Sequence, residues 1–236
     1  MCARDNRLSF ETGASSSQIK AVIFDLDGIL IDSEQVWDEA RRALTAELGG
    51  EWSEEATRAM MGMSSVEWSS YMHERLGVPL VPAEISRRVV ERLRDLYLEE
   101  LPLMPGAREA VRRMAARWPL GLASSSNREL IDLVLHESGL LDEFRATVSS
   151  EEVARGKPSP DVYLEAARRV DAEPAGCLAI EDSGNGIRAA RAAGMRVIAI
   201  PNKALPPEPE ALAEADLVIV SLDDLTPEVV EKAGFW

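Results

Sequence analysis

Two aspartates, Asp25 and Asp27, stand at the end of the apolar run 20–25 and just before Gly28. Neighbouring carboxylates can divide the work of a group-transfer reaction, because one attacks as a nucleophile while the other gives and takes a proton. We assign the first role to Asp25 and the second to Asp27. In so acidic a chain the pair could instead form a solvated turn, but its place directly after an apolar strand favours the chemical interpretation.

A second acidic pair, Glu181 and Asp182, follows the apolar run 177–180. Carboxylate oxygens are ligands that Mg²⁺ prefers, and the ion commonly takes one or two of them beside phosphate oxygens and water. The pair therefore predicts a magnesium site, whose charge would offset the repulsion between Asp25 and an incoming phosphate dianion. The alternative is a plain N-cap for the helix expected to begin at Ser183.

Hydroxyl and amine groups that could hold a phosphate follow two further strands. Ser124, Ser125 and Asn127 come at the end of the run 119–124, and Lys157 stands in a Gly-Lys-Pro turn. Hydroxyls and backbone N–H groups at a helix start bind phosphate oxygens, and a lysine adds a positive charge. The chain has only four lysines, so one in this setting stands out. Helix capping and an ordinary surface lysine are the alternatives.

One glycine pattern points to a different kind of site. Gly184, Gly186 and Ala189 match the G-x-G-x-x-A spacing of dinucleotide-binding turns. Glu181 and Asp182 stand immediately before it and would repel a pyrophosphate. We therefore expect no dinucleotide cofactor.

All of these residues are expected at one edge of a parallel sheet. Apolar or β-branched runs predict strands at 20–25, 119–124, 146–149, 177–180, 196–200 and 217–220. Amphipathic patterns predict helices at 106–117, 127–138, 159–170 and 183–193. Continuous apolar strands that alternate with helices are typical of a parallel sheet covered on both faces. Ligands bind beyond the carboxyl ends of such strands, which is where the acidic pairs, the serines and the lysine stand.

One stretch breaks the alternation of strands and helices. Residues 33–101 hold four helical patterns, at 34–48, 53–60, 64–76 and 82–100, and no convincing strand. We therefore predict an α/β fold with a three-layer Rossmann-like core of residues 19–32 and 102–236 and an inserted all-helical domain of residues 33–101. Residues 1–18 are polar and are predicted to be a flexible lead-in.

Composition narrows the class of protein and its setting. The 236 residues carry 26 basic and 41 acidic side chains, a formal net charge of −15. Such a surface repels phosphate backbones and anionic lipids, so we expect neither a nucleic-acid nor a membrane partner. Two cysteines are too few for a disulfide framework, which favours a cytoplasmic location. The compact layout suits a monomer that acts on a small molecule.

Taken in order, these residues resemble the haloacid dehalogenase superfamily of aspartate-nucleophile phosphotransferases over nearly the whole chain from residue 20. The segment 25–34, DLDGILIDSE, is similar to the first motif of the family, Ser124 to the second and Lys157 to the third. The Glu181-Asp182 pair is similar to the fourth. Ile29 stands where the family usually has threonine. True dehalogenases lack the second aspartate, so Asp27 disfavours that branch.

The resemblance implies an Mg²⁺-dependent phosphomonoester hydrolase that works through an aspartyl phosphate. It implies that Asp25, the backbone carbonyl of Asp27 and Asp182 hold the metal, with Glu181 close by. It also implies that Ser124 and Lys157 hold the phosphoryl oxygens of a small phosphate ester. A catalytically silent binding protein on the same scaffold is an alternative that the intact motifs disfavour.

Helices inserted directly after the first motif are similar to the cap of the β-phosphoglucomutase-like subgroup, which contains phosphosugar mutases and small-molecule phosphatases. Mutases of this subgroup carry a histidine at the position of Trp37 and a phosphate-binding arginine three residues after a cap glycine; if that glycine is Gly62, Ser65 replaces the arginine. Both departures argue against a mutase that holds a bisphosphate intermediate in two orientations. The segment 31–38, IDSEQVWD, instead resembles phosphatases of the subgroup that act on sugar phosphates, close to those acting on deoxyglucose or hexitol phosphates. The resemblance therefore favours a phosphatase for a small sugar or polyol phosphate. A β-phosphoglucomutase-type mutase is the alternative.

The cap is also the expected place of substrate choice. Its candidate residues are Trp37, Trp52, Gly62 and Trp68. Packing inside the cap core is the commoner fate of such tryptophans and is the alternative for each of them.

Overall fold

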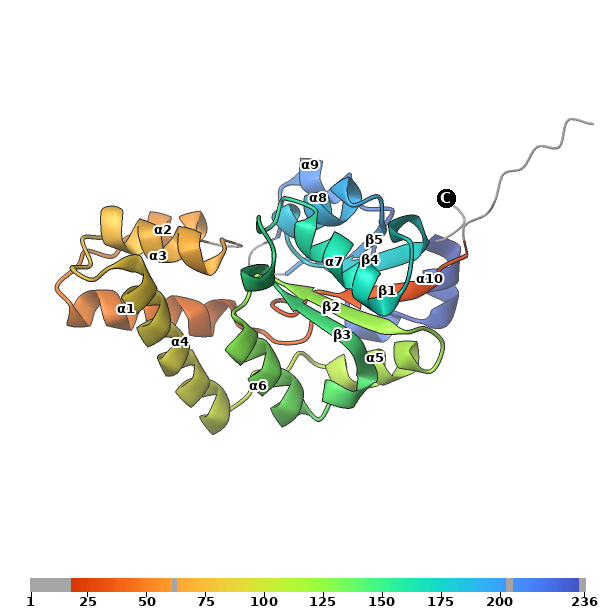
Figure 1. Cartoon of the computed structure of the whole chain (residues 1–236), viewed down its shortest axis with the longest axis horizontal. Coiled ribbons are helices and arrows are strands. Elements are labelled where there is room, and N and C mark those ends of the chain that lie inside the picture. The colour runs from red at the N-terminus through yellow and green to blue at the C-terminus, as the bar shows by residue number, and fades with distance from the viewer. Residues whose placement is uncertain (1–17, 61–62, 203–205, 234–236) are drawn as a thin grey trace, which may run out of the picture.

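A six-stranded parallel sheet forms the centre of the protein (Figure 1). The structure, a computed structural model, describes residues 18–60, 63–202 and 206–233. The strands are β1 (Ala21–Phe24), β2 (Leu120–Ser124), β3 (Phe144–Ser149), β4 (Cys177–Glu181), β5 (Arg196–Ala199) and β6 (Leu217–Val218). Their order, β3-β2-β1-β4-β5-β6, is the Rossmann-like arrangement. The predicted fold class is confirmed.

Helices cover both faces of the sheet, which explains the continuous apolar strands. The helices α5 (Ala107–Ala115), α6 (Arg128–Ser138) and α10 (Pro227–Ala233) pack on one face, and α7 (Asp161–Val170) and α8 (Gly184–Ala192) pack on the other. In β1, Val22 and Phe24 join the first of these two cores, whereas Ala21 and Ile23 join the second. All four side chains are fully buried, and burial of a large apolar side chain contributes about 1.5–3 kcal/mol. A short helix, α9 (Pro209–Leu212), lies against α8.

Four helices follow β1 and form a layer beside the sheet (Figure 1). They are α1 (Glu34–Glu47), α2 (Glu54–Ala59), α3 (Ser65–Glu74) and α4 (Pro82–Glu99), and we call them the helical insertion. The Oγ of Ser53 accepts the N–H of Ala56, and Ser64 forms a capping box with Glu67. None of the helices in the described ranges is both long and apolar enough to cross a bilayer.

The two chain segments that connect the helical insertion to the sheet run side by side. The N–H of Asp32 donates to the carbonyl oxygen of Pro102 at 2.8 Å, and the N–H of Met104 donates to that of Leu30 at 2.9 Å. These bonds fix the start and the end of the insertion next to each other. The insertion therefore leaves and rejoins the sheet at a single paired connection.

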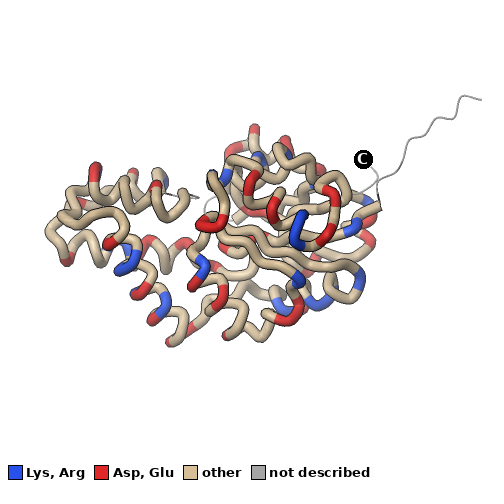
Figure 2. The backbone as a smooth tube through the Cα atoms, in the orientation of Figure 1, with Lys and Arg blue, Asp and Glu red and all other residues tan. Residues whose placement is uncertain are grey.

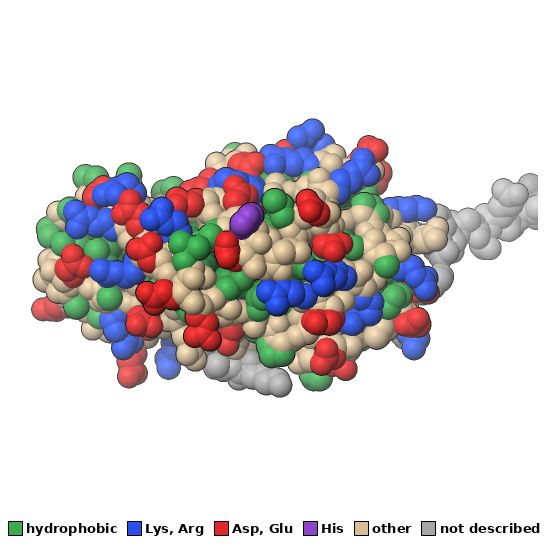
Figure 3. Space-filling model, turned by 90° about the horizontal axis from the view of Figure 1, so that it is seen from below, with side chains coloured by type: hydrophobic (Ala, Val, Ile, Leu, Met, Phe, Trp, Pro, Cys, Tyr) green, Lys and Arg blue, Asp and Glu red, His purple; other side chains and the backbone are tan. Residues whose placement is uncertain are grey.

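Acidic and basic residues alternate along the described backbone, in the helical insertion as well as in the core (Figure 2). The view from below shows acidic and basic groups side by side over both the helical insertion and the core (Figure 3). Many form exposed pairs, such as Arg87 with Glu84 at 2.6 Å. Exposed pairs contribute little to stability, so the fold depends mainly on its two buried apolar layers.

Candidate active site

A cavity of about 480 Å³ lies between the carboxyl ends of the central strands and helix α1. Its lining includes Asp25 and Asp27, which follow β1, and Asp182, which follows β4. Lys157 lines it from the connection between β3 and α7, and Trp37 lines it from α1. Residues that lie far apart in the sequence therefore meet at one edge of the sheet, as the strand pattern predicted.

Lys157 bridges the first strand to the fourth through two buried ion pairs. Its Nζ lies 2.8 Å from Oδ1 of Asp25 and 2.6 Å from Oε1 of Glu181. The side chains of Lys157 and Asp25 are only 4% and 8% exposed. Because β1 and β4 are neighbours in the sheet, one ammonium group reaches both carboxylates.

Glu181 is completely buried and uses both oxygens to hold its surroundings. Its Oε1 accepts hydrogen bonds from Lys157 and from the hydroxyl of Tyr163, at 2.6 and 2.7 Å. Its Oε2 accepts the backbone N–H groups of Asp182 and Ser183, each at 3.1 Å, and the Ser183 hydroxyl at 3.1 Å. A carboxylate has about four lone-pair sites, so these donors occupy the acceptor sites of Glu181. They also fix the loop that carries Asp182.

The glycine spacing seen in the sequence makes room for this carboxylate. A Cβ atom at Gly186 would lie 1.7 Å from Oε1 of Glu181. The helix that begins after Ser183 can therefore approach Glu181 only because it carries glycine at this position. Gly186 serves the packing of the acidic loop.

Burial and the charges of neighbouring carboxylates raise the pKa values of Asp25 and Asp182. Loss of water, followed by the charge of Glu181 among other causes, raises the pKa of Asp25 to about 8 and raises the pKa of Asp182 well above its ordinary value. Burial tends to lower the pKa of Lys157, but the charges of Asp25 and Glu181 outweigh it and raise that pKa. One ammonium thus faces three carboxylates, and the cluster can accept further positive charge.

The donor set suits a hard divalent cation. Asp25, Glu181 and Asp182 each offer a carboxylate oxygen, and these oxygens lie within 4.8 Å of one another. Since the oxygens of Glu181 are already engaged, Asp25 and Asp182 are the carboxylates best placed to coordinate an ion. Oxygen ligands and a partly open site are what Mg²⁺ requires.

Gly28 lets the turn after β1 approach the carboxylate that follows β4. Its φ is +76°, in the left-handed region that favours glycine. Its N–H donates to the carbonyl oxygen of Ile31 at 2.8 Å, which closes the turn. A Cβ at Gly28 would lie 1.9 Å from Oδ2 of Asp182, so no other residue fits without displacing that carboxylate.

Asp27 accepts hydrogen bonds from both the helical insertion and the core. Its Oδ1 accepts the hydroxyl of Ser33 at 2.5 Å and the indole N–H of Trp37 at 3.2 Å. Its Oδ2 accepts the hydroxyl of Ser126 at 2.6 Å and that of Ser124 at 3.4 Å. The carboxylate is thus held in the cavity wall between α1 and the turn after β2.

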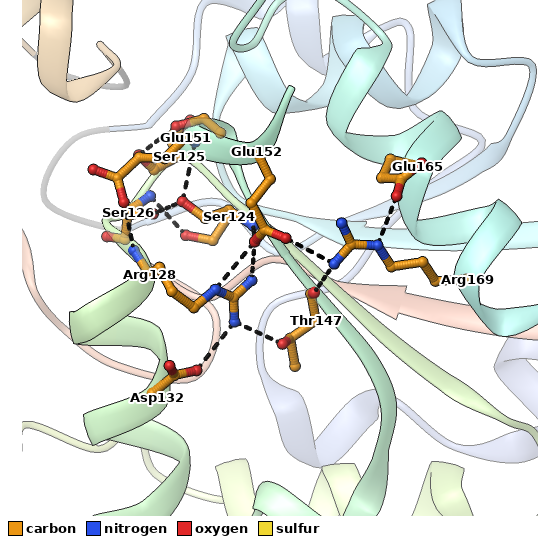
Figure 4. A network of polar contacts seen from close by, with 12 residues as sticks. Ser124, Ser125, Ser126, Arg128, Asp132, Thr147, Glu151, Glu152, Glu165 and Arg169 are labelled. Carbon is orange, nitrogen blue, oxygen red and sulfur yellow. Dashed lines mark hydrogen bonds and ion pairs between the residues drawn. The ribbon is translucent and has the colours of Figure 1, made fainter. Parts of the chain in front are cut away.

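The serine turn after β2 is supported from the connection that follows β3 (Figure 4). The Ser150 hydroxyl donates to the carbonyl oxygen of Ser125 at 2.9 Å, and the Ser149 hydroxyl donates to that of Ser126 at 2.7 Å. Ser124 is fully buried, and its Oγ accepts the N–H of Ser126 at 2.9 Å. Ser125 and Ser126 line the cavity, whereas Ser124 lies behind them.

A chain of charges joins the elements behind this turn (Figure 4). Arg128, at the start of α6, pairs with Glu152 and donates to the hydroxyl of Thr147 at 2.7 Å. Glu152 also pairs with Arg169 of α7 at 2.8 Å. The network ties α6, β3 and α7 together and so steadies the turn that faces the cavity.

Asn127 connects the core to the helical insertion. Its Oδ1 accepts the hydroxyl of Ser65 at 2.9 Å, and its Nδ2 donates to Glu151 at 2.6 Å. The side chain that the sequence proposed for phosphate binding is therefore engaged between two protein groups. It does not belong to the described lining of the cavity.

Two of the three tryptophans of the helical insertion are buried and also form cavity wall. Trp37 and Trp68 are 8% and 2% exposed, pack with ring centroids 5.8 Å apart, and both line the cavity. These two residues therefore combine the two predicted roles, because they pack in the core of the insertion and also line the cavity. Trp52 packs against the core without lining the cavity. Gly62 lies outside the described residues.

Four contributors were missed by sequence reasoning. Ser33 and Ser126 donate to Asp27, Tyr163 donates to Glu181, and Arg41 lines the cavity. Arg41 follows Trp37 by four residues, so helical spacing alone could have placed the two on one face. The contact of Tyr163 has no such signal, because it depends on how α7 packs against the sheet.

Comparison with known proteins identifies the family. A family model described as haloacid dehalogenase-like hydrolase matches residues 19–194. The chain belongs to this family. The predicted resemblance is thereby confirmed, and the chain is an enzyme of the hydrolase class.

Curated relatives and solved structures of haloacid dehalogenase-like proteins cover most of the chain. Hexitol phosphatase B of Escherichia coli K12 is 38% identical over 215 residues, which is 89% of this chain and 95% of the relative. The bifunctional riboflavin kinase/FMN phosphatase of Arabidopsis thaliana is 35% identical over 88% of this chain, which spans only 54% of that relative. CbbY from Rhodobacter sphaeroides, solved in complex with phosphate, superposes with a TM-score of 0.81 at 29% identity and covers 91% of this chain and 100% of its own.

Proposed function

We propose that this haloacid dehalogenase-like hydrolase is an Mg²⁺-dependent phosphatase that hydrolyses a small sugar or polyol phosphate through an aspartyl phosphate on Asp25. The contact between Asp25 and Lys157 at 2.8 Å, beside Asp182 in one cavity, carries this proposal. The similarity to hexitol phosphatase B and to the riboflavin kinase/FMN phosphatase adds support, because both relatives are named as phosphatases.

In the first step Asp25 attacks phosphorus while the bond from phosphorus to the leaving oxygen breaks. Protonated Asp27 gives its proton to that oxygen, so the alcohol leaves neutral. Lys157 places positive charge where the phosphoryl oxygens crowd Asp25. The N–H groups of the turn that contains Ser125 and Ser126 offer further donors from the cavity wall.

In the second step water attacks phosphorus and the bond from phosphorus to Asp25 breaks. Asp27, now a carboxylate, takes the proton from this water and returns to its starting state. Inorganic phosphate is released. Asp27 is suited to serve both steps because its hydrogen bonds come from α1 and from the β2 turn, between which the substrate would enter.

Asp25 and Asp182, with the backbone carbonyl of Asp27, would hold the metal, and Glu181 would keep the loop of Asp182 in place. The ion would supply the positive charge that lets a phosphate dianion approach the buried carboxylates. Lys157 alone offsets only one of these charges. The residues of this chain thus bind the ion, orient the nucleophile and move the proton.

Added Mg²⁺ should stabilise the chelator-treated protein more at about pH 8 than at about pH 6. The folded-state pKa of Asp25 is raised from 3.8 to about 8 and that of Asp182 is also raised, so these groups make the metal-free fold less stable as pH rises through this range. The ion compensates the charges that then appear, and at lower pH protons compete with it. Thermal melting with and without Mg²⁺ measures the effect. The control is Asp182→Asn, in which Mg²⁺ should raise Tm less than in the wild type. An equal rise in Tm at both pH values would contradict the prediction.

Gly28→Ala should lower kcat/KM by about 100-fold or more, because displacing a catalytic group by about 1 Å has this effect. The added Cβ would lie 1.9 Å from Asp182 and would push that carboxylate from its place. Steady-state hydrolysis of an aryl phosphate measures the loss.

Gly49→Ala is the matched control for this substitution. Gly49 has a φ of +75°, nearly that of Gly28, but nothing lies within 4 Å of the Cβ that alanine would add. We expect Gly49→Ala to lose about 1–2 kcal/mol of folding stability through backbone strain. Its kcat/KM should stay unchanged. An equal loss of activity in both variants would assign the effect to strain and not to Asp182.

Two contacts favour a hydrolase over the alternative of a β-phosphoglucomutase-type mutase. Trp37 and not histidine contacts Asp27. Ser65, which the resemblance aligns with the phosphate-binding arginine of mutases, donates to Asn127. The monomeric state, the cytoplasmic location, the absence of a nucleic-acid partner and the domain boundaries stay predictions.

Phosphate release across a substrate panel tests the proposed function. The panel contains an aryl phosphate and hexose, pentose, polyol and glycolate phosphates, each assayed with Mg²⁺ and with a chelator. We expect metal-dependent release of phosphate, fastest from sugar or polyol phosphates. Conversion of glucose 1-phosphate with a bisphosphate activator into glucose 6-phosphate would favour the mutase. No turnover of any compound would contradict an enzyme of either kind.

A further inference from the structure

Arg41 of α1 is a buried cation on the cavity wall. It is only 9% exposed, and it lines the cavity together with Trp37, which precedes it by four residues on the same helix. Burial lowers the pKa of Arg41 to about 10, so the side chain still carries its charge at neutral pH. The proposed mechanism makes no use of this charge.

The guanidinium group of Arg41 has aromatic neighbours, and the charges of Glu34, Asp38 and Asp27 act on it from beyond ion-pair distance. Its carbon lies 4.9 Å from the ring centroid of Trp37 and 5.5 Å from that of Trp68. Its Nε is buried without a hydrogen-bond partner. Within the described ranges no carboxylate lies within ion-pair distance of it, although the adjacent Arg42 pairs with Asp38 at 3.1 Å. A buried cation without a hydrogen-bonding partner is unfavourable, which indicates that a ligand completes it.

The position of Arg41 along α1 shows which part of a substrate it faces. The indole N–H of Trp37 lies 3.2 Å from Asp27, which would protonate the leaving oxygen. Four residues correspond to about 6 Å along a helix, so Arg41 faces the far end of a leaving group of several carbons. Glu34, two turns before Arg41, also lines the cavity, and its charge favours the cationic form of Arg41 more than that of any other carboxylate, although the two side chains form no ion pair within 4.0 Å in the described part of the chain.

Arg41 also changes what the two tryptophans can recognise. Its guanidinium lies over the rings of both Trp37 and Trp68. A face covered in this way is less open to stacking by a flat base, and the wall offers N–H donors in its place. Arginine pairs best with planar or multidentate oxyanions, to which it donates two parallel hydrogen bonds.

We propose that Arg41 selects phosphate esters that carry a second oxyanion, such as a carboxylate, at the end remote from the scissile phosphate. This inference rests on the proposed function and narrows its substrate class from sugar phosphates in general to doubly anionic ones. A phosphorylated sugar acid provides the carboxylate form of this chemistry, and a sugar bisphosphate provides the phosphate form.

Gluconate 6-phosphate and glucitol 6-phosphate form a matched pair for the test. They share the carbon chain and the scissile group and differ only in a terminal carboxylate against a hydroxymethyl group. For the wild-type enzyme we expect kcat/KM to be at least about tenfold higher for the acid, mainly through a lower KM. Glucitol 1,6-bisphosphate is the third arm and tells whether a second phosphate serves as well as the carboxylate.

Arg41→Met should abolish the preference for the acid, because methionine keeps apolar contact with the tryptophans and removes the charge. The ratio of the two kcat/KM values should fall at least about tenfold, and Arg41→Lys should recover part of it, since the charge returns without the planar fork. Arg42→Met is the matched control, because Arg42 pairs with Asp38 and its side chain is 55% exposed. That variant should keep the wild-type ratio.

The wild-type ratio is itself decisive, so the test does not depend on the folding of a variant. Hydrolysis of glucitol 6-phosphate without a preference for either anionic compound overturns the role of Arg41 and leaves the proposed function intact. A preference that survives Arg41→Met in a protein with wild-type melting also overturns it. Failure of every compound, the aryl phosphate included, overturns the proposed function and this inference with it.

Discussion

Replacement of Asp25 by asparagine should lower kcat by about 10⁴-fold or more, as expected when a covalent nucleophile is removed. Asparagine has nearly the same shape and can still accept a hydrogen bond from Lys157, but its amide oxygen does not attack phosphorus at a useful rate. Stopped assays with an aryl phosphate and with glucitol 6-phosphate measure the loss.

Stability separates this chemical effect from misfolding. Because burial raises the pKa of Asp25 to about 8, a neutral side chain there removes an unfavourable charge above that pH. The Tm of metal-free Asp25→Asn at about pH 8 should therefore be no lower than that of the wild type. Asp95→Asn is the control, since this side chain is 70% exposed. Activity of Asp25→Asn within tenfold of wild type would rule out Asp25 as the nucleophile.

Lys157→Met should lower kcat/KM by about 10³-fold and also destabilise the protein. The ammonium group lies 2.8 Å from Asp25 and 2.6 Å from Glu181, where it both balances these charges and would meet the phosphoryl oxygens. Its removal leaves buried carboxylates without their cation, which costs about 3–5 kcal/mol. Assays of activity and denaturant unfolding measure the two effects.

The loss of stability in Lys157→Met should depend on pH. Asp25 and Asp182 have raised folded-state pKa values even with the lysine present, and its removal raises them further. The folded variant therefore keeps protons on these carboxylates at pH values where the folded wild type releases them, so the penalty grows as pH rises above about 8. Lys232→Met, at an exposed position on α10, should show neither effect. A penalty that is constant with pH would show that lost packing, and not lost charge, is responsible.

The sequence was most informative where one physical signal dominates. The apolar runs that end at Phe24, Ser124 and Glu181 could be recognised because strands buried on both faces have no polar alternation. The edge of the sheet was harder. β6 is only Leu217–Val218, shorter than its apolar run, and Val220 beyond it is 73% exposed. Apolar character alone does not show where pairing with a neighbouring strand stops.

The sequence predicted that the residues at the strand ends would lie close together, but not how the groups around them are engaged. The ends of parallel strands had to bring Asp25, Lys157 and Asp182 to one edge of the sheet. That Glu181 would be engaged by Tyr163 and by backbone N–H groups depends on the packing of α7 and α8. Likewise the contact of Asn127 with the helical insertion depends on how the insertion packs against the core. No spacing of residues in the sequence predicts such contacts.

The paired connection between Asp32 and Pro102 and between Leu30 and Met104 has a consequence for variation in the helical insertion. Because backbone hydrogen bonds hold the ends of the helical insertion together, the helices beyond Ser33 and Trp37, which donate to Asp27, can be lengthened or replaced without moving Asp25. Side chains on the rest of the insertion can then change while the residues that follow β1 keep their places beside the sheet.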